Sequence, residues 1–391
     1  MATIRILFGL FLLTMIASVQ ADPHPVLIGI DAEFGVVNST SAQAIRLGAQ
    51  IAVDEINAAG GVLGGRSLAL VEKDDRSVPA RFVKNLREFA TDPNVVAVLC
   101  GRYSPVVVEA IPEIHRLKLP LLDPWAAADP ITAHNFRPDY IFRLSLRDTW
   151  AMQAMIRYAK QRGMHKLGLL VPTTEWGRSN LAAAETLDQT DPQVTVIDTQ
   201  WYSWGDNSLL DQYQALRKAG VEGILFISND REGVILVKEI AALPKAQRLP
   251  ILAAWGITGG NLFQNTGPAL KEIELAVVQT YSFVGANDPV AQQVVQAAQR
   301  YGIDAPRHIL SPVGVAHAYD LVHILARAIQ MANSTDRSTI RDALEKVTNY
   351  AGLVKNYPQP FAPDRHDALS LQEVFMARYA EDGAIIRMDS E

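Results

Sequence analysis

Cysteine and clustered positive charge are almost absent from this sequence. The one cysteine, Cys100, excludes an intrachain disulfide, and it stands in the apolar run VVAVLC, where a buried and unreactive side chain is expected. The formal net charge is −6, and lysine and arginine are nowhere clustered. The sequence therefore lacks the basic surface patch that binds nucleic acid or an anionic membrane, and we expect the protein to bind neither of them.

The common catalytic signatures are also missing. The sequence contains no G-x-x-x-x-G-K-[ST], G-x-S-x-G or H-E-x-x-H motif. The glycine-rich GGVLGG at 60–65 follows a predicted helix, so it reads as a helix stop and a turn. The eight histidines are scattered, and His317 and His323, six residues apart on one predicted helix, are poorly spaced for a shared metal ion. Asp74 and Asp75 could be metal ligands, but no third carboxylate is spaced to complete a metal site with them. We therefore expect no catalytic residues, no cofactor and no metal.

Only one apolar run, at the N-terminus, could be taken for a membrane segment. Arg5 precedes apolar residues 6–17, and Val19-Gln20-Ala21 has the small-residue pattern of a cleavage site. A membrane anchor is the alternative, but a dozen apolar residues are too few for a span of roughly 30 Å, which takes about 20. The pattern predicts a signal peptide at residues 1–21, with no cysteine nearby for a lipid anchor.

Short apolar runs alternate with amphipathic segments along the remaining chain. One series of runs lies at 26–30, 67–75, 95–100 and 119–123, and a second at 166–172, 194–202, 221–228 and 249–255. This alternation predicts parallel sheets with helices on both faces. A chain of 391 − 21 = 370 residues exceeds one comfortable core. We predict an α/β fold with two doubly wound parallel-sheet lobes. A mostly helical block after residue 275 completes one of them, and the chain ends in a hairpin around Asp382-Gly383.

Tryptophan is placed unusually. In open α/β sheets ligands bind outside the carboxyl ends of the strands. Trp125, Trp176 and Trp255 each follow a predicted strand directly and so fall at that edge. A single tryptophan is more often a core residue, and core or rim is the expectation for the other three. Three at equivalent positions favour a shared cleft lined by aromatic rings.

Several longer stretches resemble a known family. They include GAQIAVDEINAAGGVLGG (48–65), LVEKDDRSVPARFVKNL (70–86), PLLDPWAAADP (120–130) and KLGLLVPTTEWGRS (166–179). Together they resemble the type I periplasmic solute-binding proteins of the leucine/isoleucine/valine-binding family, over nearly the whole mature chain. The resemblance implies two lobes joined by a three-stranded hinge that close on a ligand. It assigns residues 22–145 and 277–352 to lobe one, and residues 146–276 and 353–391 to lobe two.

The resemblance also implies a role. Such proteins work in the periplasm, are expected to be monomers, and deliver a small molecule to a membrane-embedded ABC permease or, as an alternative, present it to a sensory receptor. They make or break no bond. Genes for a permease and an ATPase beside this one would favour transport, and a gene for a kinase or chemoreceptor would favour sensing.

Individual ligand positions follow from the same resemblance. Ser104 matches a serine whose hydroxyl and backbone N–H hold the ligand's carboxylate. Ala126 and Ala127 lie in the loop whose backbone groups complete that grip, although a threonine hydroxyl of amino-acid binders is missing at Ala127. Asp148 matches an acidic residue near the ligand's amino group. A helix N-cap is an equally good interpretation of Asp148, and both could hold.

Two departures from the family pattern bear on the ligand. Trp176 replaces a common tyrosine, and Trp255 stands where amino-acid binders have a glutamate that pairs with the α-ammonium. A buried ammonium without a carboxylate costs several kcal/mol. An aliphatic amino acid is therefore a poor candidate unless Asp148 or Asp230 substitutes.

The leading hypothesis is an aromatic or apolar carboxylate, held near Ser104, with Tyr103 in the same loop and Arg102 adding positive charge. The alternative is a primary or quaternary amine, because tryptophan faces attract cations. Asp148 and Asp230 would then balance the charge. The orientation of Arg102 distinguishes the two, since an arginine that points into the cleft favours an acid.

Overall fold

The first lobe is built on a five-stranded parallel sheet. The computed structural model of the protein describes residues 24–190 and 193–388, so the predicted signal peptide lies outside the described residues. The strand order is β2-β1-β3-β4-β5. The strands are β1 (Val26–Ala32), β2 (Leu68–Asp74), β3 (Val95–Cys100), β4 (Leu121–Asp123) and β5 (Ile141–Arg143). All six residues of β3 are buried, because helices cover both faces of the sheet.

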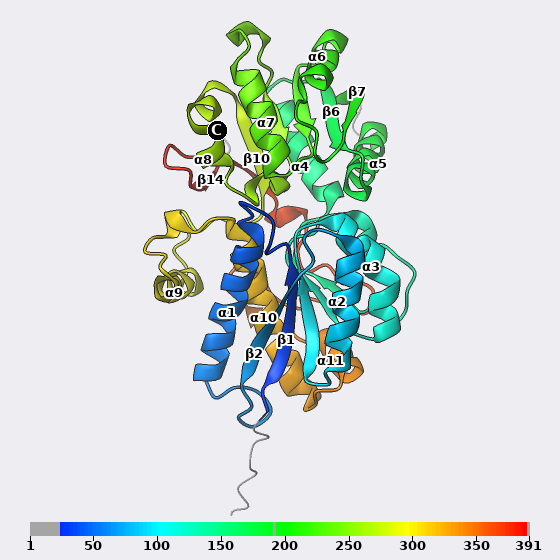
Figure 1. Ribbon diagram of the computed structural model, residues 1–391, viewed down its shortest axis with the longest axis vertical. Helices are drawn as coiled ribbons and strands as arrows, with labels where there is room; N and C mark the ends of the chain where they lie inside the picture. Colours follow the sequence, from blue (N-terminus) through cyan, green and yellow to red (C-terminus); the bar gives the residue numbers. More distant parts are fainter. Residues whose placement is uncertain (1–23, 191–192, 389–391) are drawn as a thin grey trace, which may run out of the picture.

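Two helical layers enclose this sheet (Figure 1). Helices α1 and α10 pack on one face, and α2 and α3 pack on the other. The lobe-one helices are α1 (Ser41–Ala58), α2 (Pro79–Thr91), α3 (Ser104–Leu117), α9 (Pro289–Ala298), α10 (Pro312–Ala332) and α11 (Arg337–Leu344). Gly48 lets α1 approach α10 closely, since a Cβ there would lie 2.0 Å from the carbonyl oxygen of Val315.

The second lobe contains a seven-stranded sheet in the order β14-β13-β10-β9-β8-β6-β7. Five strands are parallel: β6 (Lys166–Pro172), β7 (Thr195–Tyr202), β8 (Gly223–Phe226), β9 (Ile251–Ala253) and β10 (Leu275–Gln279). The antiparallel hairpin β13 (Phe375–Tyr379) and β14 (Ile385–Arg387) completes one edge. Its turn holds Gly383 at φ +88°, as the sequence predicted. The helices are α4 (Asp148–Gln161), α5 (Glu175–Thr190), α6 (Leu210–Ala219), α7 (Asp230–Ala241) and α8 (Leu262–Thr266).

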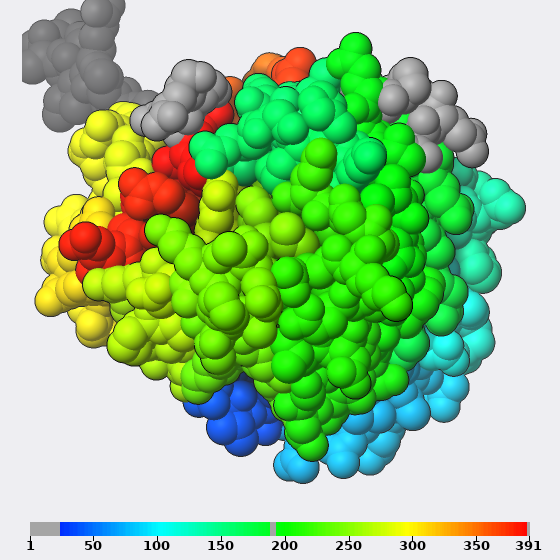
Figure 2. Space-filling model, turned by 90° about the horizontal axis from the view of Figure 1, so that it is seen from above, coloured from blue at the N-terminus to red at the C-terminus, as the bar shows by residue number. Residues whose placement is uncertain are grey.

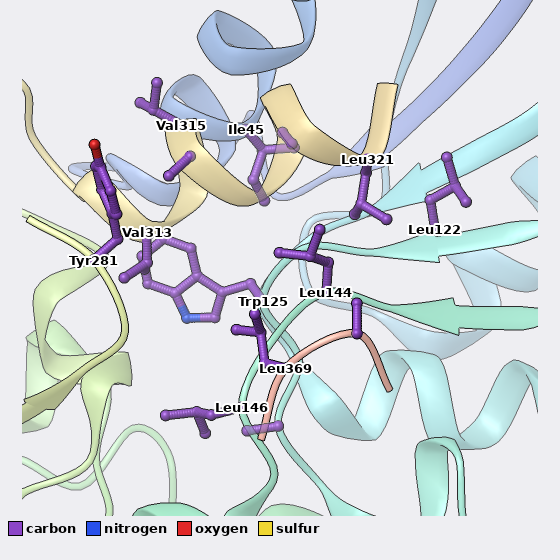
Figure 3. Close-up of a cluster of buried hydrophobic side chains, with 14 of the residues drawn as sticks. Ile45, Leu122, Trp125, Leu144, Leu146, Tyr281, Val313, Val315, Leu321 and Leu369 are labelled. Atoms are coloured by element: carbon purple, nitrogen blue, oxygen red, sulfur yellow. The ribbon is translucent and has the colours of Figure 1, made fainter. Parts of the chain in front are cut away.

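The chain passes between the two sheets three times, after β5, after β10 and before β13. These crossings form the hinge, and residues from each of them pack around the Trp125 indole (Figure 3). They are Leu144 and Leu146, Tyr281, and Leu369. Viewed from above, lobe two covers most of lobe one, whose blue and cyan segments show at the rim (Figure 2). The predicted fold of two parallel-sheet lobes is confirmed.

The stretch before the last hairpin packs on lobe one. The ring of Phe361 lies 5.1 Å from that of Phe142 in β5, and Leu353 N–H donates to the Asp320 carboxylate of α10 at 2.7 Å. A two-stranded ribbon, β11 (Tyr350–Ala351) with β12 (Asn356–Tyr357), begins this stretch. The lobe boundaries remain a prediction, and we propose moving two of them: the one at residue 277 to the end of β10 at Gln279, and the last one from residue 352 to near residue 370. Among the described residues, no helix combines the length and apolar character needed to cross a membrane.

Candidate ligand-binding site

A small cavity, with free volume of only about 10 Å³, lies where the carboxyl ends of both sheets face each other. Seven of the ten residues expected to bind the ligand line it, because strand ends converge at this edge. Ala126, Asp148 and Asp230 do not line it. The lining residues are Arg102, Tyr103, Ser104, Trp125, Ala127, Trp176, Trp204, Asn229, Trp255 and Gly256.

Aromatic rings from opposite lobes meet across this cavity. The ring centroids of Trp125 and Trp255 lie 5.7 Å apart at 47°, and Tyr103 meets Trp204 edge-on at 5.4 Å. Each such pair contributes roughly 0.5–1.5 kcal/mol beyond the burial of its area. Small-molecule pockets occupy about 300–1,000 Å³, far more than this cavity offers, so the rings must separate to admit a ligand. The His317 ring lies 5.7 Å from the Trp255 ring. Burial lowers the pKa of that imidazole to about 4, so His317 is neutral at pH 7 and places no positive charge next to Trp255.

The Arg102 guanidinium links the two lobes. It donates to the Asp230 carboxylate at 2.7 Å, to the Tyr103 hydroxyl at 2.8 Å and to the Gly256 carbonyl at 3.3 Å. Its Nε lies 3.6 Å from the carboxylate of Glu33. Arg102 therefore points into the cleft, the orientation that favours an acid, but two carboxylates already face its charge. Asp230, expected as a counter-ion for an amine, is engaged by Arg102 instead.

Two glycines allow this approach. A Cβ on Gly259 would lie 1.9 Å from Nη1 of Arg102, and one on Gly260 would lie 2.1 Å from a carboxylate oxygen of Asp230. The Gly259 carbonyl also accepts from the N–H groups of Thr40 and Ser41, at 2.9 and 3.1 Å, where α1 begins. These contacts join lobe two to lobe one, so the structure shows the lobes closed.

The loop after β4 is held internally. The Ser104 hydroxyl oxygen accepts from the N–H groups of Ala127 and Ala128 at 3.1 and 3.2 Å. Ala126 N–H donates to the Asp123 carboxylate at 2.7 Å, and Trp125 N–H donates to the same oxygen at 3.0 Å. The backbone donors expected to grip a ligand at Ala126 and Ala127 are therefore used within lobe one, because Asp123 and Ser104 reach them first.

Asp148 positions Trp176 and caps nothing. It is the first residue of α4, the N-cap position is Arg147, and the side chain that accepts a backbone N–H at this helix end is Asp129, which lies 3.4 Å from Thr149 N. The N-cap interpretation is therefore wrong. One Asp148 carboxylate oxygen accepts from Nε1 of Trp176 at 3.0 Å. Burial, helped by the charge of Asp129, raises the pKa of Asp148 to about 7, while hydrogen bonds from Ser179, Trp176 and Asn180 oppose the shift.

Residues 28–384 match a family model described as periplasmic binding protein. The chain belongs to the periplasmic binding protein family. A Leu/Ile/Val-binding protein homolog 3 of Brucella melitensis is 24% identical over 307 residues, which cover 75% of this chain and 76% of that protein. A type 1 periplasmic binding protein of Bordetella pertussis shares the fold with a TM-score of 0.83 at 20% identity, over 93% of this chain and 100% of that chain.

A solute-binding protein of an ABC transporter from R. palustris, solved in complex with benzoate, has a TM-score of 0.76 at 15% identity, over 93% of this chain and 95% of that chain. The resemblance read from the sequence is thus confirmed. As a periplasmic binding protein, the chain binds a small molecule and is not an enzyme. Family membership also implies the periplasm, as expected.

The sequence reasoning missed three residues that line the cavity of this binding protein: Trp204, Asn229 and Gly256. Asn229 and Gly256 lie in stretches that directly follow predicted strands, but their side chains carry no aromatic or charged signal. Trp204 stands two residues beyond the end of β7 at Tyr202. The rule that selected the other tryptophans would have found Trp204 if it had allowed two residues after the strand.

Proposed function

We propose that this periplasmic binding protein captures a small aromatic or apolar carboxylate between its lobes and delivers it to an ABC permease. One observation carries the proposal. The described residues that line the cavity include four tryptophans and a tyrosine but no carboxylate side chain. Flat aromatic walls suit a ring, and a site without an anion does not suit a buried cation.

Both acidic residues that an amine would require are occupied. Asp230 pairs with Arg102 at 2.7 Å, and Asp148 lies behind Trp176, whose indole N–H it accepts. A buried ammonium would therefore cost several kcal/mol unless one of these contacts broke. That cost disfavours both an aliphatic α-amino acid and an amine as the ligand.

The ligand's carboxylate has a favourable place near Ser104. Helix α3 begins at Ser104 and runs 14 residues, so its N-terminal end carries partial positive charge beside the cavity. The Ser104 oxygen accepts two backbone N–H groups, which leaves its hydroxyl hydrogen free to donate. An anion at such a helix end gains about 0.3–1 kcal/mol, and up to about 2 kcal/mol when partly buried.

The relatives support the class and leave two ligand types to compare. The R. palustris protein was solved with benzoate, whereas the Brucella relative is named for leucine, isoleucine and valine. Amino-acid binding is therefore the second candidate, favoured by that name and not by the cavity. Presentation to a sensory receptor is the alternative to delivery to a permease.

A thermal-shift screen tests the proposal. Three matched sets should be compared at millimolar concentration: aromatic acids such as benzoate and phenylacetate, aliphatic amino acids, and alkylamines that carry a phenyl ring, such as benzylamine. We expect acids to raise the melting temperature, because a ligand that binds only the folded protein stabilises it by mass action. Shifts from amino acids or amines alone, with none from the acids, would reject the proposal.

A further inference from the structure

Three side chains that could hold a metal ion meet at the far end of lobe one. His115 lies in the last turn of α3, and His134 and Asp139 lie in the segment between β4 and β5. One ligand atom from each of the three lies within 4.8 Å of the other two. Helix α3 begins at the cavity, and eleven residues at 1.5 Å each place His115 roughly 16 Å from Ser104. The cluster is therefore separate from the ligand site.

The hydrogen bonds of His115 determine which ring nitrogen carries its lone pair. Nδ1 lies 2.7 Å from the Ile111 carbonyl, which can only accept, so Nδ1 carries the hydrogen. Tyr140 N–H donates to Nε2 at 3.3 Å, so Nε2 presents its lone pair. The same nitrogen lies 3.2 Å from a carboxylate oxygen of Asp139, which accepts from Ile141 N–H at 2.9 Å. A cation shared by these two acceptors, either zinc in place of the Tyr140 contact or a proton on Nε2, removes their repulsion.

His134 adds a second, independent observation. Its side chain is 9% exposed, and neither ring nitrogen makes a hydrogen bond to any of the described residues. Buried polar nitrogens without partners cost about 1–3 kcal/mol each, so such a ring calls for a partner. Its Nε2 lies 3.5 Å from the same Asp139 oxygen.

We propose that His115, His134 and Asp139 bind a zinc ion, with the fourth position open to water. Zinc at about 2.0–2.1 Å from tetrahedral ligands separates those ligands by roughly 3.3 Å. The two separations from Asp139, 3.2 and 3.5 Å, lie close to this value, and the ligand atoms of the two histidines lie within 4.8 Å of each other. Two imidazoles and one carboxylate select zinc over magnesium or calcium, which prefer oxygen ligands.

The surroundings fit a zinc site. The bond from Nδ1 of His115 to the Ile111 carbonyl is the outer contact that orients metal-binding histidines. Two nearby arginines have acceptors of their own, since Arg137 donates to the carbonyl of His134 and Arg341 donates to the carbonyl of Asp139. Nδ1 of His366 lies 3.4 Å from the other carboxylate oxygen of Asp139, which leaves the first oxygen to the ion. The ion would tie the end of α3 to the segment before β5 and so brace lobe one.

Zinc titration of the untagged protein, stripped with EDTA, tests this proposal. We expect one zinc per chain by calorimetry, and a melting temperature raised by about 5 °C at a zinc concentration 100 times Kd. Cobalt in place of zinc should give the visible absorption of a four-coordinate site. No binding, or no such spectrum, would overturn the proposal.

His134→Phe is the decisive variant, since it keeps a ring of similar size and removes both nitrogens. We expect it to lose zinc affinity by at least about 100-fold, beyond the effect of outer-shell changes. In EDTA it should melt close to the parent, because neither nitrogen makes a hydrogen bond and the variant loses only the 3.5 Å approach of Nε2 to Asp139. His308→Gln, at a side chain that is 63% exposed, should bind zinc like the parent. If His134→Phe fails to fold, Asp139→Asn replaces it, and zinc binding unchanged in either variant would refute the site.

Discussion

Replacing Arg102 with methionine should shift the protein toward its open form. The Arg102 and Asp230 side chains are 2% and 12% exposed in the closed structure, and they belong to different lobes. In the open form water can hydrate both charges, so the substitution acts on closure. Removing one partner of a buried ion pair costs about 3–5 kcal/mol, because the other charge stays buried alone.

That cost has a measurable size. Each 1.4 kcal/mol changes an equilibrium constant tenfold, so the ratio of closed to open molecules should fall by about 10²–10³. If only the closed form holds the ligand firmly, the apparent Kd rises by up to the same factor. Small-angle X-ray scattering should show a larger radius of gyration, and titration of the intrinsic tryptophan fluorescence should give the weaker Kd.

Two further variants separate the causes. Arg102→Met combined with Asp230→Asn leaves no unpaired charge between the lobes. Glu33, in the same lobe as Arg102, loses its cation but keeps the hydroxyls of Ser39 and Ser41 as donors, so the double variant should restore part of the closure. A double variant as weak as the single one would mean that the Arg102–Asp230 pair does not control closure. Arg46→Met breaks a surface pair with Glu72 whose side chains are 45% and 41% exposed, worth about 0–1 kcal/mol, and should change nothing. An unchanged radius and Kd in Arg102→Met would refute the reasoning.

Trp255→Glu should weaken the binding of an aromatic acid at least tenfold and strengthen the binding of an α-amino acid in calorimetric titrations. If the order of the two affinities stays the same, Trp255 does not contact the ligand. Trp204→Ala should weaken the same acid by about tenfold, because it removes the ring that meets Tyr103 at 5.4 Å and opens the wall, and an unchanged Kd would place the ligand elsewhere. Burial, then the charge of Asp75, raises the pKa of Asp31 from 3.8 to about 8. Between these two pKa values the folded protein therefore holds a proton that the unfolded chain releases. The contribution of Asp31 to the free energy of unfolding is fully present below about pH 4. It is lost as the pH rises to about 8, at up to about 1.4 kcal/mol per pH unit. Asp31→Asn should gain stability relative to the parent between pH 5 and pH 8 in urea unfolding, and a parallel pH profile would contradict the assignment.

The fold was predictable because its signals are local. Runs such as residues 95–100 are continuously apolar, since both faces of their sheet are covered, and glycines mark the helix ends. The strand ends then locate the cavity, since parallel strands bring their following loops to one edge. Trp125, Trp176 and Trp255 reached the cavity for this topological reason and not through any motif.

Contacts that depend on lobe closure were not predictable. Arg102 and Asp230 are 128 residues apart and meet only when the lobes come together. The sequence showed both charges but not that each would neutralise the other. His115 and Asp139 are likewise 24 residues apart, and an irregular segment joins them. The expectation of scattered, unrelated histidines therefore failed to anticipate their approach.

A crystal structure of the protein with the best-binding acid from the thermal-shift screen would show directly whether this cavity holds the ligand. We expect an aromatic ring between Trp125, Trp176 and Trp255, with its carboxylate beside the hydroxyl of Ser104 at the start of α3. A ligand bound outside this cavity, or one that directs a cationic group to Asp148 or Asp230, would contradict it.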